Sequence, residues 1–183
     1  MIPSEKEALA LHRKYGSDER IVRHCETVTG VAKVLAEGLR LRGQGLDVRA
    51  VIAGAMLHDI GRSRVQTVRH GLEGAGIAES EGVEREVVEI IRRHVGAGIS
   101  SEEARALRLP DLDYIPVTLE ERVVCFADKM VDGDRVRPFE AEVYRFKVKG
   151  HDVARLLALK QRLQDELGED PEKFIFDKVK ETR

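Results

Sequence analysis

Residues 51–61 read Val-Ile-Ala-Gly-Ala-Met-Leu-His-Asp-Ile-Gly, and this stretch decides the fold. Its first seven residues are small or apolar, and they lead directly into two adjacent polar side chains, His58 and Asp59. The apolar run predicts a buried helix over residues 47–59 that Gly61 ends. Burial of an imidazole beside a carboxylate is costly unless both are neutralised, and a bound metal ion is the simplest explanation for the pair.

Helical periodicity also dominates the rest of the chain. Apolar residues recur at spacings of three and four over residues 18–40 and 84–95, and the Gly/Ala-rich residues 71–81 favour a closely packed helix. Two capping boxes mark the starts of further helices, and they are Ser100 with Glu103 and Thr118 with Glu121. The remaining predicted segments are loops over 62–69 and 109–117, and helices over 119–131, 156–167 and from Asp170-Pro171 onward.

The sequence carries little sign of β-structure. Residues 139–150 fit either a short strand or more helix, and the residues before Ser17 carry no motif. No alternating strand pattern of useful length, internal repeat or low-complexity linker is present. The sequence therefore predicts an all-α protein that forms a single domain over residues 1–183.

Composition narrows the class of protein. The chain has 183 residues, of which 42% are hydrophobic and 35% charged, which is typical of a globular protein with a real core. A net charge of −2 gives no global electrostatic case for nucleic acid, so a nucleic-acid partner is not expected. Two cysteines without a Cys-x-x-Cys motif, no signal-peptide core and no membrane-length apolar run predict a cytoplasmic protein without a membrane partner.

Six polar side chains lie on or beside the predicted apolar helix faces. They are His24, His58, Asp59, His70, His94 and Asp128. Singly, each has an ordinary explanation, such as a hydrogen-bonded core histidine, a charge that offsets a helix dipole at His94, or a pair between Asp128 and Lys129. Together they converge on one helical core and predict a metal site. The other two histidines, His12 and His151, stand in polar surroundings and are assigned to the surface.

The order of these residues resembles that of the HD superfamily of metal-dependent phosphohydrolases. Residues 58–61 are that family's HDIG variant, His24 precedes them, and Phe126-Ala127-Asp128-Lys129 looks like its final aspartate motif. The segments 91–94 and 70–75 look like the two additional histidine motifs of its dinuclear members. The resemblance covers residues 20–138, which we interpret as the HD core, with residues 139–183 as a C-terminal helical extension.

The resemblance implies a helical bundle with a dinuclear metal site in its core. Six ligands are too many for one metal that keeps an open position, but they suit two metals about 3.5–4 Å apart. Imidazole and carboxylate ligands suit Fe, Mn, Co, Ni or Zn. Asp59 is the expected bridge, with His24, His58 and Asp128 on one metal and His70 and His94 on the other.

The implied reaction is hydrolysis of a phosphate ester by a metal-activated hydroxide, because metals lower the pKa of bound water from about 16 toward about 7. Asp59 and Lys129 are the expected catalytic residues. The candidate phosphate-binding cations are Arg62, Arg64, Lys129, Arg135 and Arg137. The expected partner is a small phosphorylated, nucleotide-like substrate, cleaved by a phosphomonoesterase or phosphodiesterase of class EC 3.1 or 3.6.

Two alternatives stay open from the sequence. One is an HD module that binds a nucleotide and regulates a partner without catalysis. The other is an RNA 2′,3′-cyclic phosphate phosphodiesterase. Such an enzyme would favour a basic or aromatic surface, and the sequence gives little sign of one, since it has five Phe, three Tyr and no Trp.

The C-terminal segment carries apolar residues that either cap the core or form a homodimer interface. They are Phe174, Ile175, Phe176 and Val179.

Overall fold

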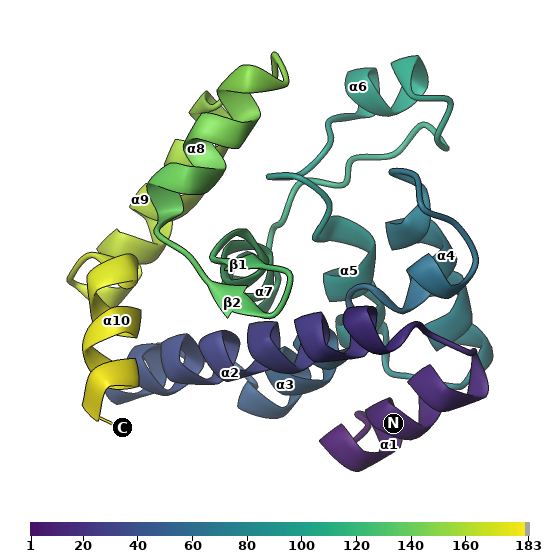
Figure 1. The fold of residues 1–183 in the computed structure, drawn as a ribbon, viewed down its shortest axis with the longest axis horizontal. Helices are drawn as coiled ribbons and strands as arrows, with labels where there is room; N and C mark the ends of the chain where they lie inside the picture. The colour runs from purple at the N-terminus through teal and green to yellow at the C-terminus, as the bar shows by residue number, and fades with distance from the viewer. Residues whose placement is uncertain (182–183) are drawn as a thin grey trace.

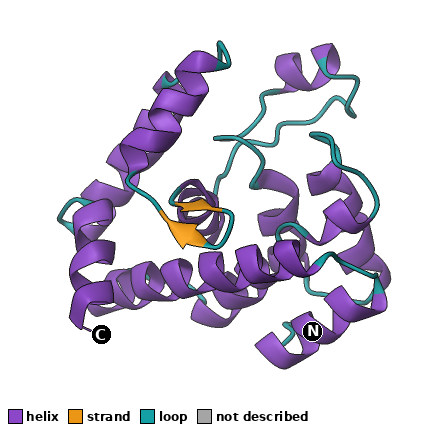
Figure 2. Cartoon of the chain, in the orientation of Figure 1, coloured by secondary structure: helices purple, strands orange, loops and turns teal. Residues whose placement is uncertain are grey.

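The computed structural model describes the backbone of residues 1–181 and the side chains of residues 1–178. Its helices are α1 (Glu5–Lys14), α2 (Glu19–Leu41), α3 (Val48–Leu57), the 3₁₀ helix η1 (Ile60–Ser63), α4 (His70–Ser80), α5 (Arg85–Arg93), α6 (Ser101–Ala106), α7 (Leu119–Lys129), α8 (Phe139–Val148), α9 (Ala154–Leu167) and α10 (Pro171–Glu181). Within the described residues one two-stranded antiparallel hairpin, β1 (Val131–Asp132) with β2 (Arg135–Val136), completes the fold (Figures 1 and 2). The prediction of an all-α fold is confirmed.

Helix α2 organises the core. It is 23 residues long and runs along the base of the molecule, with α3 against it and α7 crossing above it near the centre (Figure 1). Its buried positions recur three and four apart, which places one continuous apolar stripe against α3 and α7. Helix α5 packs on α3 and α7, and α4 packs on α5 and η1. These contacts bring the ends of α3, α4, α5 and α7 toward one region of the core.

The last two helices fold back onto this core. Helix α9 contacts α7 and α2, and α10 contacts α2 and α9. Leu156, Leu163 and Ile175 are almost fully buried in the same hydrophobic cluster as the residues of α2 and α7. Ile175 therefore caps the core in this structure, while the side chain of Val179 lies outside the described residues. None of the described helices combines the length and the apolar composition that a membrane span needs.

One local expectation, an exposed His12, was wrong, and the structure adds detail to the others. Helix α1 was not predicted, although Ser4 and Glu7 form a capping box at its start. The helix expected over 119–131 ends at Lys129, because Val131 enters the hairpin, and the ambiguous residues 139–150 form α8. His12 is fully buried rather than exposed, since its Nε2 lies 2.7 Å from the Met56 carbonyl and its Nδ1 lies 2.8 Å from the Ser17 hydroxyl. The partner that buries it is 44 positions away, which neighbouring residues cannot reveal.

Gly61 explains how the segment after α3 meets α4. A Cβ at this position would stand 2.0 Å from the carbonyl oxygen of His70 and 2.5 Å from the backbone nitrogen of Gly74. Both are backbone atoms, so no side-chain rotation relieves the clash. The missing side chain therefore lets the turn that follows His58 and Asp59 lie directly against the first turn of α4.

We expect Gly61→Ala to lower the melting temperature by about 6–12 °C, because a clash between backbones costs about 3 kcal/mol or more. The matched control is Gly76→Ala in α4, where a Cβ would meet nothing within 4 Å. That variant should be neutral or stabilised by up to about 1 kcal/mol, because alanine favours the helix. Thermal unfolding followed by circular dichroism measures both, and equal melting temperatures would contradict the close approach.

Candidate metal centre

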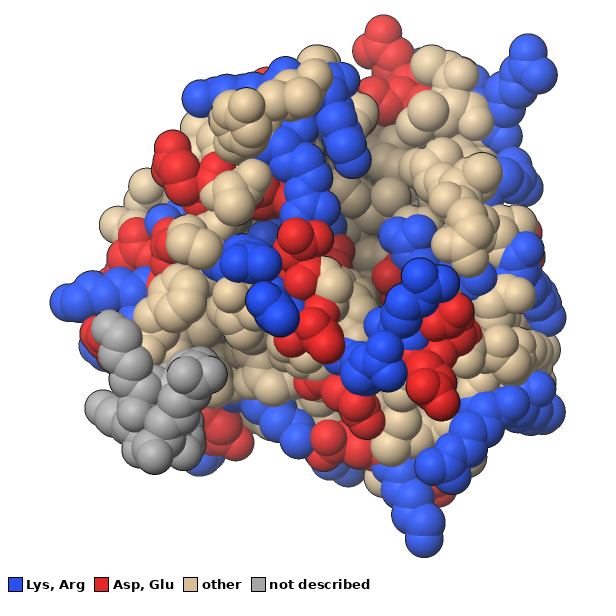
Figure 3. Space-filling model, in the orientation of Figure 1, with Lys and Arg blue, Asp and Glu red and all other residues tan. Residues whose placement is uncertain are grey.

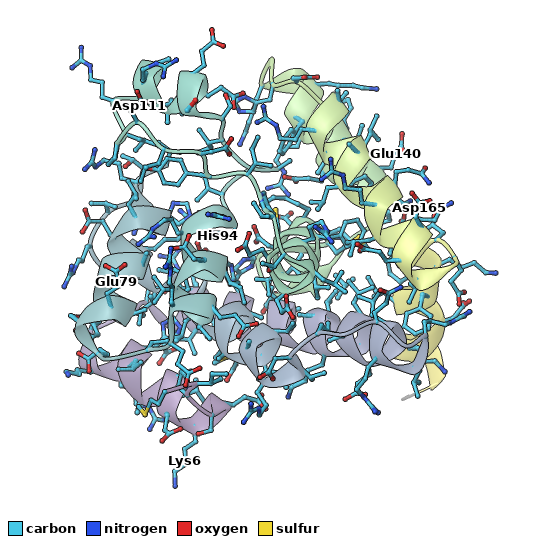
Figure 4. The ribbon with its side chains drawn as sticks, turned by 180° about the vertical axis from the view of Figure 1, so that it is seen from behind. Lys6, Glu79, His94, Asp111, Glu140 and Asp165 are labelled. Carbon is cyan, nitrogen blue, oxygen red and sulfur yellow. The ribbon has the colours of Figure 1, made fainter. Side chains whose placement is uncertain are left out.

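The structure brings all six predicted ligands into one place, and most of them come from helix ends. His24 lies in the first half of α2, His58 and Asp59 directly follow α3, His70 begins α4, His94 directly follows α5, and Asp128 lies near the end of α7. His94 is seen inside the bundle in Figure 4. At a helix end the backbone changes direction, so the adjacent His58 and Asp59 can face the same site, which a continuous helix would not allow.

The carboxylate of Asp59 lies at the middle of the cluster. Its Oδ1 is 3.1 Å from Nε2 of His70 and 3.4 Å from Nε2 of His94, and its Oδ2 is 3.8 Å from Nε2 of His58. The two Nε2 atoms of His70 and His94 are themselves 3.0 Å apart. Asp59 therefore contacts one pair of histidines through one oxygen and a third histidine through the other.

Asp128 and His24 complete the opposite side. Oδ1 of Asp128 lies 3.0 Å from Nε2 of His24 and 3.6 Å from Nε2 of His58. The His58 ring stands between the two sides, with its centroid 5.2 Å from that of His24 and 4.9 Å from that of His94. The cluster therefore has two lobes that share His58 and Asp59.

Backbone carbonyls fix the orientation of all four rings. The Nδ1 atoms of His24, His58, His70 and His94 lie 2.7–2.8 Å from the carbonyl oxygens of Gly133, Ala55, Thr67 and Ile91, respectively. A carbonyl can only accept, so Nδ1 carries the proton. In the neutral ring, Nε2 then presents its lone pair to the centre of the cluster, which is the arrangement of metal-binding histidines.

The buried polar atoms fit divalent cations. His58 Nε2 and Asp59 Oδ1 are buried without a hydrogen-bond donor or acceptor of their own, and the Nε2 lone pairs of His70 and His94 face each other. Such atoms are costly unless a proton or a metal ion lies between them. Three overlapping triads have all ligand atoms within 4.8 Å, namely His24-His58-Asp59, His58-His94-Asp128 and Asp59-His70-His94. The donor set therefore matches one or more metal ions.

The electrostatics favour ligand protonation states at His94, Asp59 and Asp128, but not at His58. Burial lowers the pKa of His58, but the charges of Cys25 and Asp59 outweigh it and hold the pKa well above its usual value, so a metal ion bound to this ring would displace a proton. Burial lowers the pKa of His94 to about 4, so this ring is neutral near pH 7. Burial raises the pKa of Asp59, but the charge of His58 and the close approach of the His70 and His94 rings outweigh it and hold the pKa well below its usual range. Burial is likewise outweighed at Asp128 by the charge of Lys129, and its pKa is also well below the usual range. Both carboxylates are therefore anionic.

Only two of the five predicted phosphate-binding cations line the cavity above the cluster. Nε of Arg62 lies 2.6 Å from Oδ2 of Asp59, and Lys129 forms a short ion pair with Oδ2 of Asp128. Arg64 instead pairs with Glu73 at 3.7 Å and lies over the Tyr15 ring.

Arg135 and Arg137 also lie elsewhere. Both are exposed at the hairpin, and neither lines the cavity. Closeness in sequence to a ligand suggested Arg64, Arg135 and Arg137, but the turns after η1 and α7 direct them away. A phosphate-binding role finds no support for these three residues.

Sequence reasoning missed most of the cavity itself. It has a volume of about 1020 Å³, and the hollow lies between α8 and α6 (Figure 3). Beyond the cluster, its charged and aromatic lining includes Arg20, Arg145, Phe146, Lys149 and Arg155. These residues come from segments without a family motif. The one available signal was the spacing of Arg145 and Lys149, four apart, which places both on one helix face.

Comparison with known sequences identifies relatives. The family model described as HD domain matches residues 21–131. The chain is 39% identical over 178 residues to the tRNA (cytidine(56)-2′-O)-methyltransferase of Picrophilus torridus, which covers 96% of this chain and 51% of that protein. The protein of the same name from Thermoplasma volcanium is 38% identical, over 93% of this chain and 49% of that protein. The chain thus spans about half the length of these methyltransferases.

A third relative and two solved structures are also similar to this chain. An uncharacterized protein of Methanocaldococcus jannaschii is 37% identical, over 80% of this chain and 89% of that protein. The HD domain of the phosphodiesterase PgpH from L. monocytogenes has a TM-score of 0.59 at 15% identity, covering 94% of this chain and 99% of that domain. The same domain in complex with cyclic-di-AMP has a TM-score of 0.55 at 16% identity, covering 86% and 93%. At this identity, the likeness shows the fold alone.

We expect gently purified protein to hold about two divalent metal ions per chain and His94→Ala to hold about one, because that variant removes a ligand from one lobe. Mass spectrometry of the metals measures this. A chelator should also lower the melting temperature, since metal binds only the folded state.

The matched control is His151→Ala, which removes an exposed histidine from the cavity wall and should leave the metal content unchanged. Absence of metal from the wild-type protein, even after reconstitution with Mn or Fe under reducing conditions, would exclude a metal centre.

Proposed function

The chain belongs to the HD domain family, and on that premise we propose that it is a metal-dependent phosphohydrolase that cleaves a phosphate ester of a nucleotide-like molecule. The observation that carries the proposal is the six-residue cluster, in which four imidazoles direct Nε2 toward two anionic carboxylates at the floor of a large cavity. A site of this kind combines metal ligands with space for a substrate.

The residues of the cluster would hold two metals in the way the sequence suggested. His24, His58 and Asp128 would hold one, and His70 and His94 the other, with Asp59 shared, as its place in two of the three triads supports. Bound divalent metals would supply an activated water and polarise the phosphoryl oxygens. The chain's contribution is to fix every donor atom in advance, because each ring is already held by a carbonyl.

Arg62 is suited to bind the phosphate. It uses Nε for Asp59, which leaves the two terminal nitrogens of its guanidinium group for non-bridging phosphate oxygens. Its side chain is about one-third exposed, and it lines the cavity. Arg62 thereby ties the substrate's position to that of the central carboxylate.

Lys129 has a different part in the proposed mechanism. Burial lowers the pKa of its ammonium group, but the charge of Asp128 outweighs it, so the pKa is raised and the group is charged. The ammonium is committed to Asp128, and its side chain is only 8% exposed. We therefore assign Lys129 chiefly to holding Asp128 in position as an anion, with its positive charge also favouring the anionic transition state.

One further candidate substrate follows from the names of the relatives. The names of two relatives specify tRNA, so the expectation that nucleic acid is not a partner finds no support in them, and an RNA terminus with a 2′,3′-cyclic phosphate is a second candidate substrate. The methyltransferase activity in the names of these relatives belongs to proteins about twice as long as this chain. Imidazole and carboxylate donors suit a divalent metal, so we assign the cluster to hydrolysis rather than to methyl transfer.

We expect the wild-type protein with Mn or Fe to hydrolyse bis(p-nitrophenyl) phosphate and members of a panel of nucleotide monoesters, diesters and 2′,3′-cyclic phosphates. Asp59→Asn should lower kcat at least about a hundredfold, because loss of groups that merely support metal ligands already costs 10- to about 100-fold. Steady-state release of p-nitrophenol or phosphate measures this.

Arg137→Gln is the control, since this exposed arginine lies away from the cavity, and its kcat should equal that of the wild type. Protein that binds metal and nucleotides without hydrolysing any substrate would favour the non-catalytic binding module.

A further inference from the structure

The cavity is larger than a single phosphate at the metal centre requires. Its volume of about 1020 Å³ lies at the upper end of the range of about 300–1000 Å³ for ligand pockets. From His24, Asp59 and Asp128 it extends past the hairpin to α8 and to the turn that joins α8 to α9. A substrate that fills it must therefore reach well beyond the reacting phosphorus.

The two walls of the cavity differ in chemistry. The wall formed by the loop before α4, the loop after α5 and α6 is mainly apolar, with Val68, Val95, Ala97, Ile99, Ala106 and Leu107. The wall formed by α8, the following turn and the start of α9, which we name the α8 wall, carries Glu142, Arg145, Phe146, Lys149, His151, Asp152 and Arg155. In Figure 3 the Lys and Arg side chains follow the α8 edge of the hollow, whereas the opposite edge is mainly uncharged.

Most charges in the cavity lining already have partners. Five of its six Lys and Arg residues pair with carboxylates, namely Arg20 with Asp18, Arg62 with Asp59, Lys129 with Asp128, Arg145 with Glu142, and Arg155 with Glu103. Among the described residues, Lys149 is the lining cation for which no carboxylate lies within ion-pair distance. It sits one turn after Arg145, on the same face of α8. Lys149 is exposed at the charged wall, and an unpaired cation there attracts an anion that enters the cavity.

Two rings on the α8 wall provide a surface for a nucleobase. Phe146 is half-buried, and the His151 ring packs against it edge to face, with centroids 5.6 Å apart. The His151 backbone N–H donates to the Phe146 carbonyl at 2.9 Å, which fixes the turn between the rings. Aromatic and histidine rings bind unpaired bases by stacking, with little dependence on base identity.

We propose that the α8 wall binds the second phosphate and the adjoining base of the substrate, which is therefore a nucleotide unit with a phosphate on each side. This inference rests on the proposed function, because the metal centre must bind the first phosphate. Lys149 contacts the second phosphate, and Phe146 with His151 contacts the base between. The α8 wall lies outside residues 21–131, so it gives this chain a specificity that the family's shared motifs do not encode.

The simplest probe is pApA, a 5′-phosphorylated dinucleotide. Water attacks the internal phosphorus, the bond from phosphorus to the 3′ oxygen breaks, and that oxygen takes a proton. Two molecules of the mononucleotide result, one of which carries the new oxygen on its phosphate. Bis(p-nitrophenyl) phosphate is the comparison substrate, because it has a phosphodiester but neither a second phosphate nor a base.

Lys149→Gln should lower the ratio of kcat/KM for pApA to that for bis(p-nitrophenyl) phosphate about tenfold, mainly through KM. The matched control is Lys147→Gln. Lys147 lies in the last turn of α8, two residues before Lys149, so its charge also offsets the helix dipole, but it does not line the cavity. A ratio that is unchanged in Lys149→Gln, or that falls equally in both variants, overturns the inference.

A binding measurement separates this inference from the proposed function. If the wild type hydrolyses neither substrate, the proposed function fails, and calorimetric titration of the metal-loaded wild type with pApA still tests Lys149. Binding that Lys149→Gln weakens about tenfold supports the α8 wall, and binding that it leaves unchanged, or no binding, overturns it. A 5′-phosphorylated RNA octamer distinguishes a free dinucleotide from the end of an RNA as the source of the ligand. A site for free dinucleotides excludes the octamer, whereas a site for RNA ends binds it with the same dependence on Lys149.

Discussion

The hydrogen bond from a histidine Nδ1 to a backbone carbonyl is the interaction on which this site depends. In His58, His70 and His94 the acceptor is the carbonyl three residues earlier, so a local turn of the backbone aims each ring. In His24 the acceptor is Gly133, in the hairpin after α7, so the aim of this ring depends on tertiary structure. The three local hydrogen bonds form when the helix ends fold. The rings of His58, His70 and His94 are therefore oriented before a metal ion binds.

This arrangement explains which parts of the site were predictable from the sequence. His58, His94 and Asp128 follow apolar residues at helical spacing, and burial of a polar group on an apolar face is a signal that a single sequence contains. Their meeting point could be inferred because a helical protein of this size has one core. His70 stands outside the helical pattern, and its only signal among the residues was its place before the Gly/Ala-rich helix; the family resemblance assigned it to the second metal.

The three arginines that lie away from the cavity and the lining residues that the sequence did not indicate have a common physical cause. Phosphate-binding roles were assigned to Arg64, Arg135 and Arg137 by closeness along the chain, but turns decide where a side chain points after a helix ends. Lys149 and Phe146 were missed because they reach the cavity from a helix whose position is set by packing against distant segments. A ligand that directly follows a buried helix is constrained by that helix, whereas a residue on a cavity wall is constrained by the whole fold.

The packing of α9 and α10 bears on where this protein can be divided. The family motifs stop near residue 138, but Leu156, Leu163 and Ile175 belong to the same buried cluster as α2 and α7. Arg155 also reaches across to the Gly98 carbonyl at 2.7 Å and so ties α9 to the loop that follows His94. The evolutionary module and the cooperative folding unit therefore have different boundaries. A fragment cut at the end of the shared motifs would retain every candidate metal ligand, yet it would expose an apolar surface and release one wall of its own substrate cavity.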